Sequence, residues 1–178
     1  MPFLSPQTLP DIFRQDLSRY AALVQFLQSV MRGESAFSPG ERELIAAYVS
    51  GLNACDYCHG AHQAIATDLG IDSQLLEAML QDLDTAPVGD RFRAVLALVQ
   101  KLTLTPSKVT QGDIDAVAQA GWSERAIQDA IEVCALFSFM NRIVNGYGFE
   151  TPDGQQMAAM AKGINTHGYE APLTMKAE

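Results

Sequence analysis

Apolar residues recur at steps of three and four positions along most of the chain, which is the spacing that one face of an α-helix requires. The first such run covers 10–31, where the apolar positions are Ile12, Phe13, Leu17, Tyr20, Val24, Leu27 and Met31. No segment shows the strict alternation of apolar and polar residues that is typical of a strand. The pattern therefore predicts an all-α fold that opens with one amphipathic helix.

Helix start and stop signals divide the rest of the chain. The clearest start is Ser38-Pro39-Gly40-Glu41, in which Ser38 can cap, Pro39 suits the first helical position and Glu41 completes a capping box. Together these signals predict a bundle of about seven or eight helices in a single domain, 1–178, with a loose tail over 162–178. The helices are expected at 10–31, 39–52, 55–69, 72–80, 90–103, 110–121, 124–146 and 153–161.

The helix expected at 124–146 differs from the others in its polarity. Its segment 131–140 is apolar nearly all round, which predicts a central position in the bundle. A polar stripe then follows at helical spacing, made of Ser138, Asn141, Arg142 and Asn145. This stripe fits a hydrogen-bond network between helices or subunits, and it equally fits a substrate pocket lined by Asn141 or Arg142.

Composition narrows the class of protein. Of 178 residues, 48% are hydrophobic and only 19% are charged, which predicts apolar faces buried in a homo-oligomer, whether dimer, trimer or hexamer. The net charge of −9 disfavours binding to nucleic acid or to an anionic membrane surface. The sequence has no run of about 18 apolar residues, so no membrane span is predicted. The first residues do not have the pattern of a secretory signal, and a cytoplasmic, reducing location is therefore expected.

Three of the residues that carry chemistry share one helix face. Cys55, Cys58 and His62 are spaced i, i+3 and i+7, and the positive end of a helix dipole favours thiolate at the two cysteines. Glu43, on the preceding helix, could hold the imidazole in one tautomer and support its charged form. A thiolate of this kind can attack a peroxide O–O bond, become a sulfenic acid and condense with a second thiol, while a histidine carries the proton.

The motif Glu43-x11-Cys55-x2-Cys58-x3-His62 resembles that of the AhpD-like branch of the carboxymuconolactone decarboxylase superfamily. The chain length and the segment 139–143 are similar to a subgroup labelled peroxidase-related. The resemblance implies an oligomeric, all-helical thiol-dependent peroxidase that reduces small hydroperoxides and is regenerated by a dithiol protein. It implies Cys58 as the peroxidatic thiol, Cys55 as its resolving partner, and Glu43 and His62 as the proton relay, with no metal or organic cofactor.

One position departs from the best-known members, which carry a second histidine just before the second cysteine. Here that position is Tyr57, so the relay is expected to be shorter or differently wired, and Tyr57 becomes a candidate substrate-binding residue together with Asn141 and Arg142.

Other interpretations of the cysteines remain open. A decarboxylase or other lactone-acting enzyme on the same fold would leave the cysteines incidental. A redox sensor would use them without catalysis, and a zinc module could take Cys55, Cys58, His62 and His59 as ligands. The run from Cys55 to His59 also spells a c-type haem attachment signature, and the plainest alternative is two buried, inert thiols. Cys134 is expected to be core, His59 to be exposed or at the rim, and His167 to be solvated.

Overall fold

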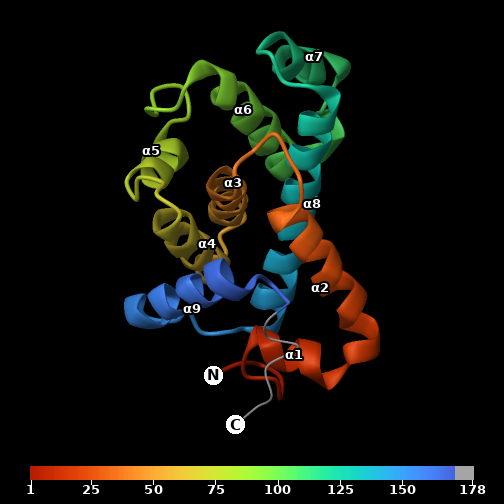
Figure 1. Cartoon of the computed structure of the whole chain (residues 1–178), viewed down its shortest axis with the longest axis vertical. Coiled ribbons are helices and arrows are strands. Elements are labelled where there is room, and N and C mark those ends of the chain that lie inside the picture. The colour runs from red at the N-terminus through yellow and green to blue at the C-terminus, as the bar shows by residue number, and fades with distance from the viewer. Residues whose placement is uncertain (171–178) are drawn as a thin grey trace.

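The protein is described by a computed structural model over residues 1–170, and within that range it contains α-helices and one short 3₁₀ turn but no strand (Figure 1). The all-α prediction is confirmed, with nine α-helices in this range instead of seven or eight. The elements are α1 (Leu9–Gln15), α2 (Leu17–Arg32), α3 (Pro39–Leu52), α4 (Asp56–Asp68), α5 (Leu75–Gln81), α6 (Asp90–Leu104), the 3₁₀ turn η1 (Pro106–Lys108), α7 (Gln111–Gln119), α8 (Glu124–Tyr147) and α9 (Gly154–His167).

The first predicted helix is wrong in one respect, because Asp16 breaks it into α1 and α2. Asp16 adopts φ −140° and ψ 74°, and its side chain accepts a hydrogen bond from the backbone N–H of Arg19, 3.1 Å away. A short acidic side chain competes for backbone donors in this way and so favours a helix cap over a helix interior. The apolar spacing continues across the break, which is why periodicity alone does not reveal it.

The start of α3 is confirmed in detail. The backbone N–H of Ser38 donates to Glu41 Oε2 at 2.7 Å, and the backbone N–H of Glu41 donates to Ser38 Oγ at 3.2 Å. These reciprocal bonds form the predicted capping box, with Pro39 in the first turn. The helix that follows is therefore fixed at its first residue by sequence-local contacts.

Helix α3 occupies the centre of the molecule, where Figure 1 shows it nearly end-on with the other helices around it. Every residue from 42 to 50 is buried, and α3 packs against α2, α4, α5, α6 and α8. Gly51 permits the close approach of neighbours, since a Cβ there would lie 2.7 Å from Leu80 Cδ1 and 3.0 Å from His59 Nδ1. Small residues on α3 thus let the motif helix α4 lie against it.

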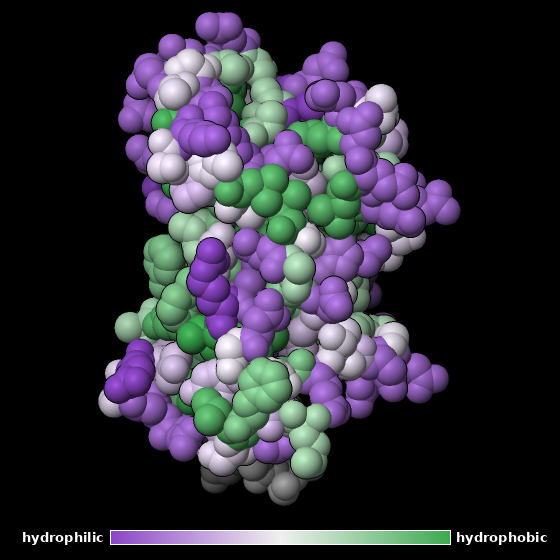
Figure 2. All heavy atoms as spheres, turned by 180° about the vertical axis from the view of Figure 1, so that it is seen from behind, coloured by the Kyte–Doolittle hydropathy of each residue, from purple (hydrophilic) through white to green (hydrophobic). Residues whose placement is uncertain are grey.

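Helix α8 runs along one side of the bundle, and its interior position is only partly as predicted. Of its 24 residues, 11 are buried, whereas within the apolar segment Ala135 is exposed and Phe139 is 44% exposed. Figure 2 shows further apolar area on the face opposite to that of Figure 1, interspersed with polar groups. One side of α8 is therefore open in the single chain. None of the helices in residues 1–170 combines the length and apolar character needed to cross a membrane.

The predicted end of the last helix is wrong. Helix α9 continues to His167, six residues beyond the expected end, and Gly168 then turns the chain with φ 75°. Tyr169 is 7% exposed, so the segment from 162 to 170 is not a loose tail. Packing of α9 on α4 fixes this segment, as the hydrogen bond of 2.8 Å from Asn165 to Asp68 illustrates. The rest of the predicted tail, 171–178, lies outside the described residues.

Candidate active site

The turn between α3 and α4 places both motif cysteines at the start of α4. Ala54 has φ 52°, a left-handed conformation that costs a residue with a Cβ free energy, and the backbone N–H of Cys55 then donates to Ser50 O at 2.9 Å. Cys55 becomes the N-cap residue of α4 and Cys58 lies in its first turn. Both thiols are free and buried, with 1% and 5% exposure. The predicted helix-start position of the pair is confirmed.

The two thiols form a hydrogen-bonded pair that favours one negative charge. The pKa of Cys55 is lowered to about 7, first because the Cys58 side chain hydrogen-bonds with it, and further by the Cys58 backbone N–H and by Asn141, against an opposing effect of burial. The pKa of Cys58 is raised by its hydrogen bond to Cys55, by burial and by the charge on Cys55. The pair therefore loses its first proton near neutral pH and strongly resists losing the second.

Asn141 contacts the thiols and does not line a substrate cavity. It is 1% exposed, its Nδ2 donates to Ser50 Oγ at 2.9 Å, and its Oδ1 accepts from Asn53 Nδ2 at 3.0 Å. With its amide held in this way, its side chain also hydrogen-bonds with both cysteines and lowers the pKa of each. The network interpretation of the polar stripe holds for Asn141.

Arg142, the neighbouring candidate, does not point toward the thiols. It is exposed, and its guanidinium donates to the carbonyl of Ser138 on its own helix. Neither residue lines the cavity that Cys58 reaches in the single chain, because α8 turns Asn141 toward the sulfurs and Arg142 toward solvent, and a role in substrate binding stays a prediction.

Glu43 and His62 form the predicted pair across α3 and α4. Glu43 is fully buried, and its Oε2 lies 2.6 Å from His62 Nδ1. Because a carboxylate only accepts, Nδ1 carries the hydrogen and Nε2 is left as the second, proton-accepting nitrogen. The imidazole is 7% exposed and packs on the ring of Phe137, with ring centroids 4.2 Å apart. The carboxylate thus selects one tautomer of His62.

Two further residues bind Glu43 that sequence reasoning missed. Arg32 Nη1 lies 2.6 Å from Glu43 Oε1, and the Tyr169 hydroxyl donates to Oε1 at 2.7 Å and lies 2.9 Å from Oε2. The Arg32 guanidinium also lies over the Tyr169 ring, 5.0 Å from its centroid. Arg32 ends α2 and Tyr169 follows α9, and neither belongs to a local motif that could have revealed it.

These contacts keep Glu43 charged although it is buried. Burial alone would raise its pKa, but the hydrogen bond and charge of His62, the charge of Arg32 and the hydrogen bond from Tyr169 together hold that pKa below its usual value. The pKa of Tyr169 is raised by burial and by the Glu43 charge, so its hydroxyl keeps its proton and remains a donor. The result is a buried, fully paired carboxylate behind the imidazole.

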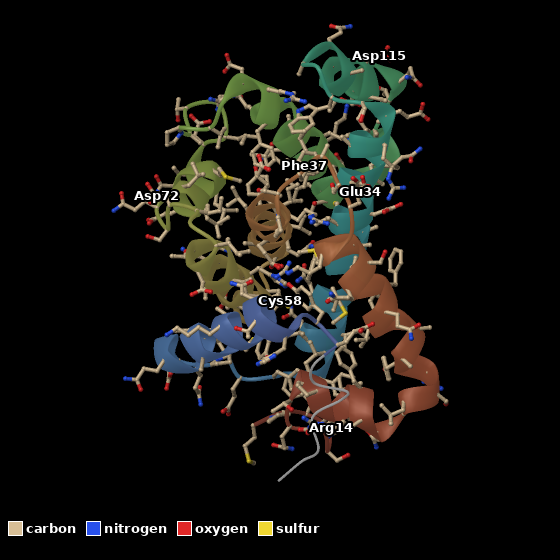
Figure 3. The ribbon with its side chains drawn as sticks, in the orientation of Figure 1. Arg14, Glu34, Phe37, Cys58, Asp72 and Asp115 are labelled. Atoms are coloured by element: carbon tan, nitrogen blue, oxygen red, sulfur yellow. The ribbon has the colours of Figure 1, made fainter. Side chains whose placement is uncertain are left out.

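Cys58 and His62 both line a cavity of about 430 Å³ (Figure 3 shows Cys58 near the centre of the molecule). Cys55 does not line it and is 1% exposed. Tyr57 contributes to the lining, and its pKa is raised to about 12 by burial and by the two thiols. The remaining lining residues are Leu9, Pro10, Phe13, Arg14, Leu27, Ala61, Ile65, Phe137, Met140, Met160, Gly163, Ile164, His167, Gly168 and Tyr169.

His59, the further zinc ligand considered, does not line this cavity. It is half-buried, as expected of a rim position, and its Nδ1 lies 3.3 Å from the carbonyl of Ala47 on α3. Within residues 1–170, no three His, Cys, Asp or Glu side chains are grouped as metal ligands, so the geometry gives the zinc interpretation no support. Cys134 is buried against Thr103, and His167 is exposed.

Comparison with solved structures identifies the fold. An uncharacterized peroxidase-related protein from Silicibacter sp. TM1040 is 28% identical, with a TM-score of 0.76 over 83% of this chain and 76% of that chain. The alkylhydroperoxidase AhpD core of a peroxidase-related protein from Ralstonia eutropha JMP134 is 23% identical, with a TM-score of 0.75 over 85% and 78%. The debrominase Bmp8, bound to 2,3,4-tribromopyrrole, is 17% identical, with a TM-score of 0.72 over 87% and 81%.

The last two likenesses concern the fold alone, and among curated proteins the chain finds no match. The model of the carboxymuconolactone decarboxylase family matches residues 19–101, a segment that contains Glu43, both motif cysteines and His62. The segment 19–101 is thus a carboxymuconolactone decarboxylase family segment, and the chain around it has the AhpD-like fold of the solved structures.

Proposed function

We propose that this protein is a thiol-dependent peroxidase that reduces organic hydroperoxides through a Cys55–Cys58 dithiol and disulfide cycle. The observation that carries the proposal is the position of Cys58, which reaches an apolar cavity also lined by His62, whereas its partner thiol is buried and does not line the cavity. A substrate in this cavity contacts the Cys58 sulfur and the His62 imidazole, and the Cys55 sulfur lies within hydrogen-bonding distance of Cys58.

The first step oxidises Cys58. Its sulfur attacks the terminal oxygen of the hydroperoxide and passes its proton to the Cys55 thiolate along the hydrogen bond between them. The O–O bond breaks, Cys58 becomes a sulfenic acid, and the hydroperoxide is reduced by two electrons to an alkoxide. His62, charged by a proton from solvent and supported by Glu43, protonates that alkoxide to the alcohol.

The second step closes the disulfide. The Cys55 sulfur attacks the Cys58 sulfenic acid and releases water, so that one hydroperoxide and two thiols yield one alcohol, one water and one disulfide. An external dithiol, which we propose is a partner protein, then returns two electrons by thiol–disulfide exchange. The residues present supply all of this chemistry, so the proposal invokes no metal or organic cofactor.

A decarboxylase or lactone-acting enzyme is the alternative on the same fold. In that case the cysteines would be incidental and their replacement would leave turnover intact. The lowered pKa of Cys55 and the contact of Asn141 with both sulfurs favour the peroxidase, because inert core thiols have no need of a hydrogen-bonded anion.

The test is hydroperoxide consumption with dithiothreitol as reductant, for the wild type and three variants. We expect Cys58→Ser to reduce turnover by about 10³-fold or more, since the attacking atom is gone. Cys55→Ser should consume one equivalent and stop at a trappable sulfenic acid. Cys134→Ser, a buried cysteine away from the cavity, is the matched control and should keep its activity. Unchanged turnover in Cys58→Ser would overturn the proposal.

We also propose that the chain works as a homo-oligomer. Several large apolar side chains are exposed in the single chain, among them Leu17, Phe26, Leu104 and Phe139. Burial of such groups between subunits is favourable, and the low fraction of charged residues agrees with it. Analytical ultracentrifugation that finds only monomer at micromolar concentration would contradict this.

A further inference from the structure

The polar groups of the cavity fall into two sets that differ in exposure. Cys58, His62 and Tyr169 are buried, whereas Arg14 and His167 are exposed. In Figure 3, Cys58 lies near the centre of the molecule and Arg14 lies at the α1 end. The cavity thus has a reactive inner end and a solvent edge that carries a guanidinium and an imidazole.

The wall between these two ends is apolar. It is formed by side chains from α1, α2, α4, α8 and α9, including Phe13, Leu27, Ile65, Phe137 and Met140. Hydrogen peroxide is only slightly larger than a water molecule, which takes up about 30 Å³ in the liquid, so it would leave most of a 430 Å³ cavity unfilled. The cavity is therefore shaped for a substrate with a hydrocarbon body.

Arg14 is held in position at the solvent edge. Its Nη1 lies 3.1 Å from Asp11 Oδ1, while the other oxygen of Asp11 accepts hydrogen bonds from the backbone N–H and hydroxyl of Thr8. Asp11 does not line the cavity. Since a guanidinium has five N–H donors and this pair uses one, Arg14 retains donors for an anion at the cavity edge.

We propose that this cavity selects hydroperoxides that carry a carboxylate at the end remote from the peroxide group. The apolar body fills the cavity, the hydroperoxide reaches Cys58, and Arg14 pairs with the carboxylate at the solvent edge. This inference names the substrate class of the proposed peroxidase and so rests on that function. A local cation matters here because the net charge of −9 otherwise repels an anionic substrate.

The test compares two substrates that differ only in charge, 9-hydroperoxydecanoic acid and its methyl ester. Wild type should turn over the acid with the higher kcat/KM. Arg14→Gln should raise KM for the acid about fivefold, as suits a partly exposed ion pair, and leave the ester unchanged. Arg19→Gln is the matched control, because Arg19 also pairs with a capping aspartate three residues earlier but does not line this cavity.

Equal kcat/KM for acid and ester in the wild type would overturn the inference, as would equal effects of Arg14→Gln and Arg19→Gln. Calorimetric binding of the reduced products, 9-hydroxydecanoic acid and its ester, separates this result from failure of the peroxidase itself. If neither hydroperoxide is turned over but the hydroxy acid binds more tightly than its ester in an Arg14-dependent way, the substrate class stands and the proposed function fails. If both hydroperoxides are turned over with equal kcat/KM and the two hydroxy products bind equally tightly, the proposed function stands and the substrate class fails.

Discussion

Two regions of the molecule contribute to the site by different means. The α3–α4 region supplies the proposed reactive groups, Glu43, Cys55, Cys58 and His62, within 20 consecutive positions of the sequence. The terminal region, made of α1, α2, α9 and the turn to residue 170, supplies no thiol or motif residue. It gives the cavity much of its wall, and it gives Glu43 two of its three partners, Arg32 and Tyr169.

The difference shows that reactivity and its environment have separate origins here. The motif alone places a carboxylate beside an imidazole, but a buried carboxylate is costly unless its remaining lone pairs are satisfied. The terminal region satisfies them and closes an apolar cavity over Cys58 at the same time. Variants in the two regions should therefore fail in different ways.

Among variants that keep both thiols, the largest effect is expected from His62, in the α3–α4 region. His62→Asn removes the group that protonates the departing alkoxide, and general acid catalysis of this kind contributes about 10²- to 10⁴-fold. We expect kcat for hydroperoxide reduction to fall by that factor, with the unfolding free energy changed far less than the rate. A variant that keeps more than half of wild-type kcat would show that His62 carries no proton.

Glu43→Gln should come next, and it should damage stability as well as rate. Removing the charge leaves Arg32 without its buried partner, and breaking such a pair costs about 3–5 kcal/mol. Because the Arg32 side chain is 15% exposed and can reach water, we expect the lower end, about 3 kcal/mol, in urea unfolding. Glu41→Gln is the control, since glutamine also completes a capping box, and an equal loss in that variant would contradict the ion-pair explanation.

Tyr169→Phe tests the terminal region alone. It removes the hydroxyl that donates to Glu43, and a hydrogen bond to a charged group contributes about 2 kcal/mol. We expect a stability loss of about that size and a smaller fall in kcat than His62→Asn gives, because the proton carrier remains. Tyr147→Phe, which lies outside the cavity, should cost less than 0.5 kcal/mol, as is typical of a peripheral substitution. Equal losses in both variants would assign the effect to packing.

The smallest expected effect is the pH dependence of the thiol pair. With the Cys55 pKa lowered to about 7, the thiolate fraction rises as pH increases through neutrality, so the ultraviolet absorbance of thiolate, which needs no access to the buried sulfur, should increase about tenfold between pH 6 and pH 8. Asn141→Ala removes a hydrogen bond to the thiols and should move this midpoint to higher pH. A midpoint near 9, the value of an unperturbed thiol, would exclude the hydrogen-bonded pair.

Local signals predicted the helices well wherever a capping residue and an apolar face coincided. The capping box at Ser38, the turn at Gly70 and the helix beginning after Ser123 are found as expected. Predictions were wrong where the same periodicity continued across a break, as at Asp16, or where packing on α4 extended a helix, as in α9. The single-domain boundary stays a prediction.

The sequence by itself determined the fold class and the candidate reactive residues, because helix periodicity, caps and the spacing from Glu43 to His62 depend only on neighbours along the chain. The tertiary structure decided which sulfur lines the cavity and that Asn141 hydrogen-bonds with the thiols. It also decided that Arg32 and Tyr169 bind the Glu43 carboxylate. Those contacts join residues up to 126 positions apart, and their formation depends on how whole helices pack, which no local pattern records.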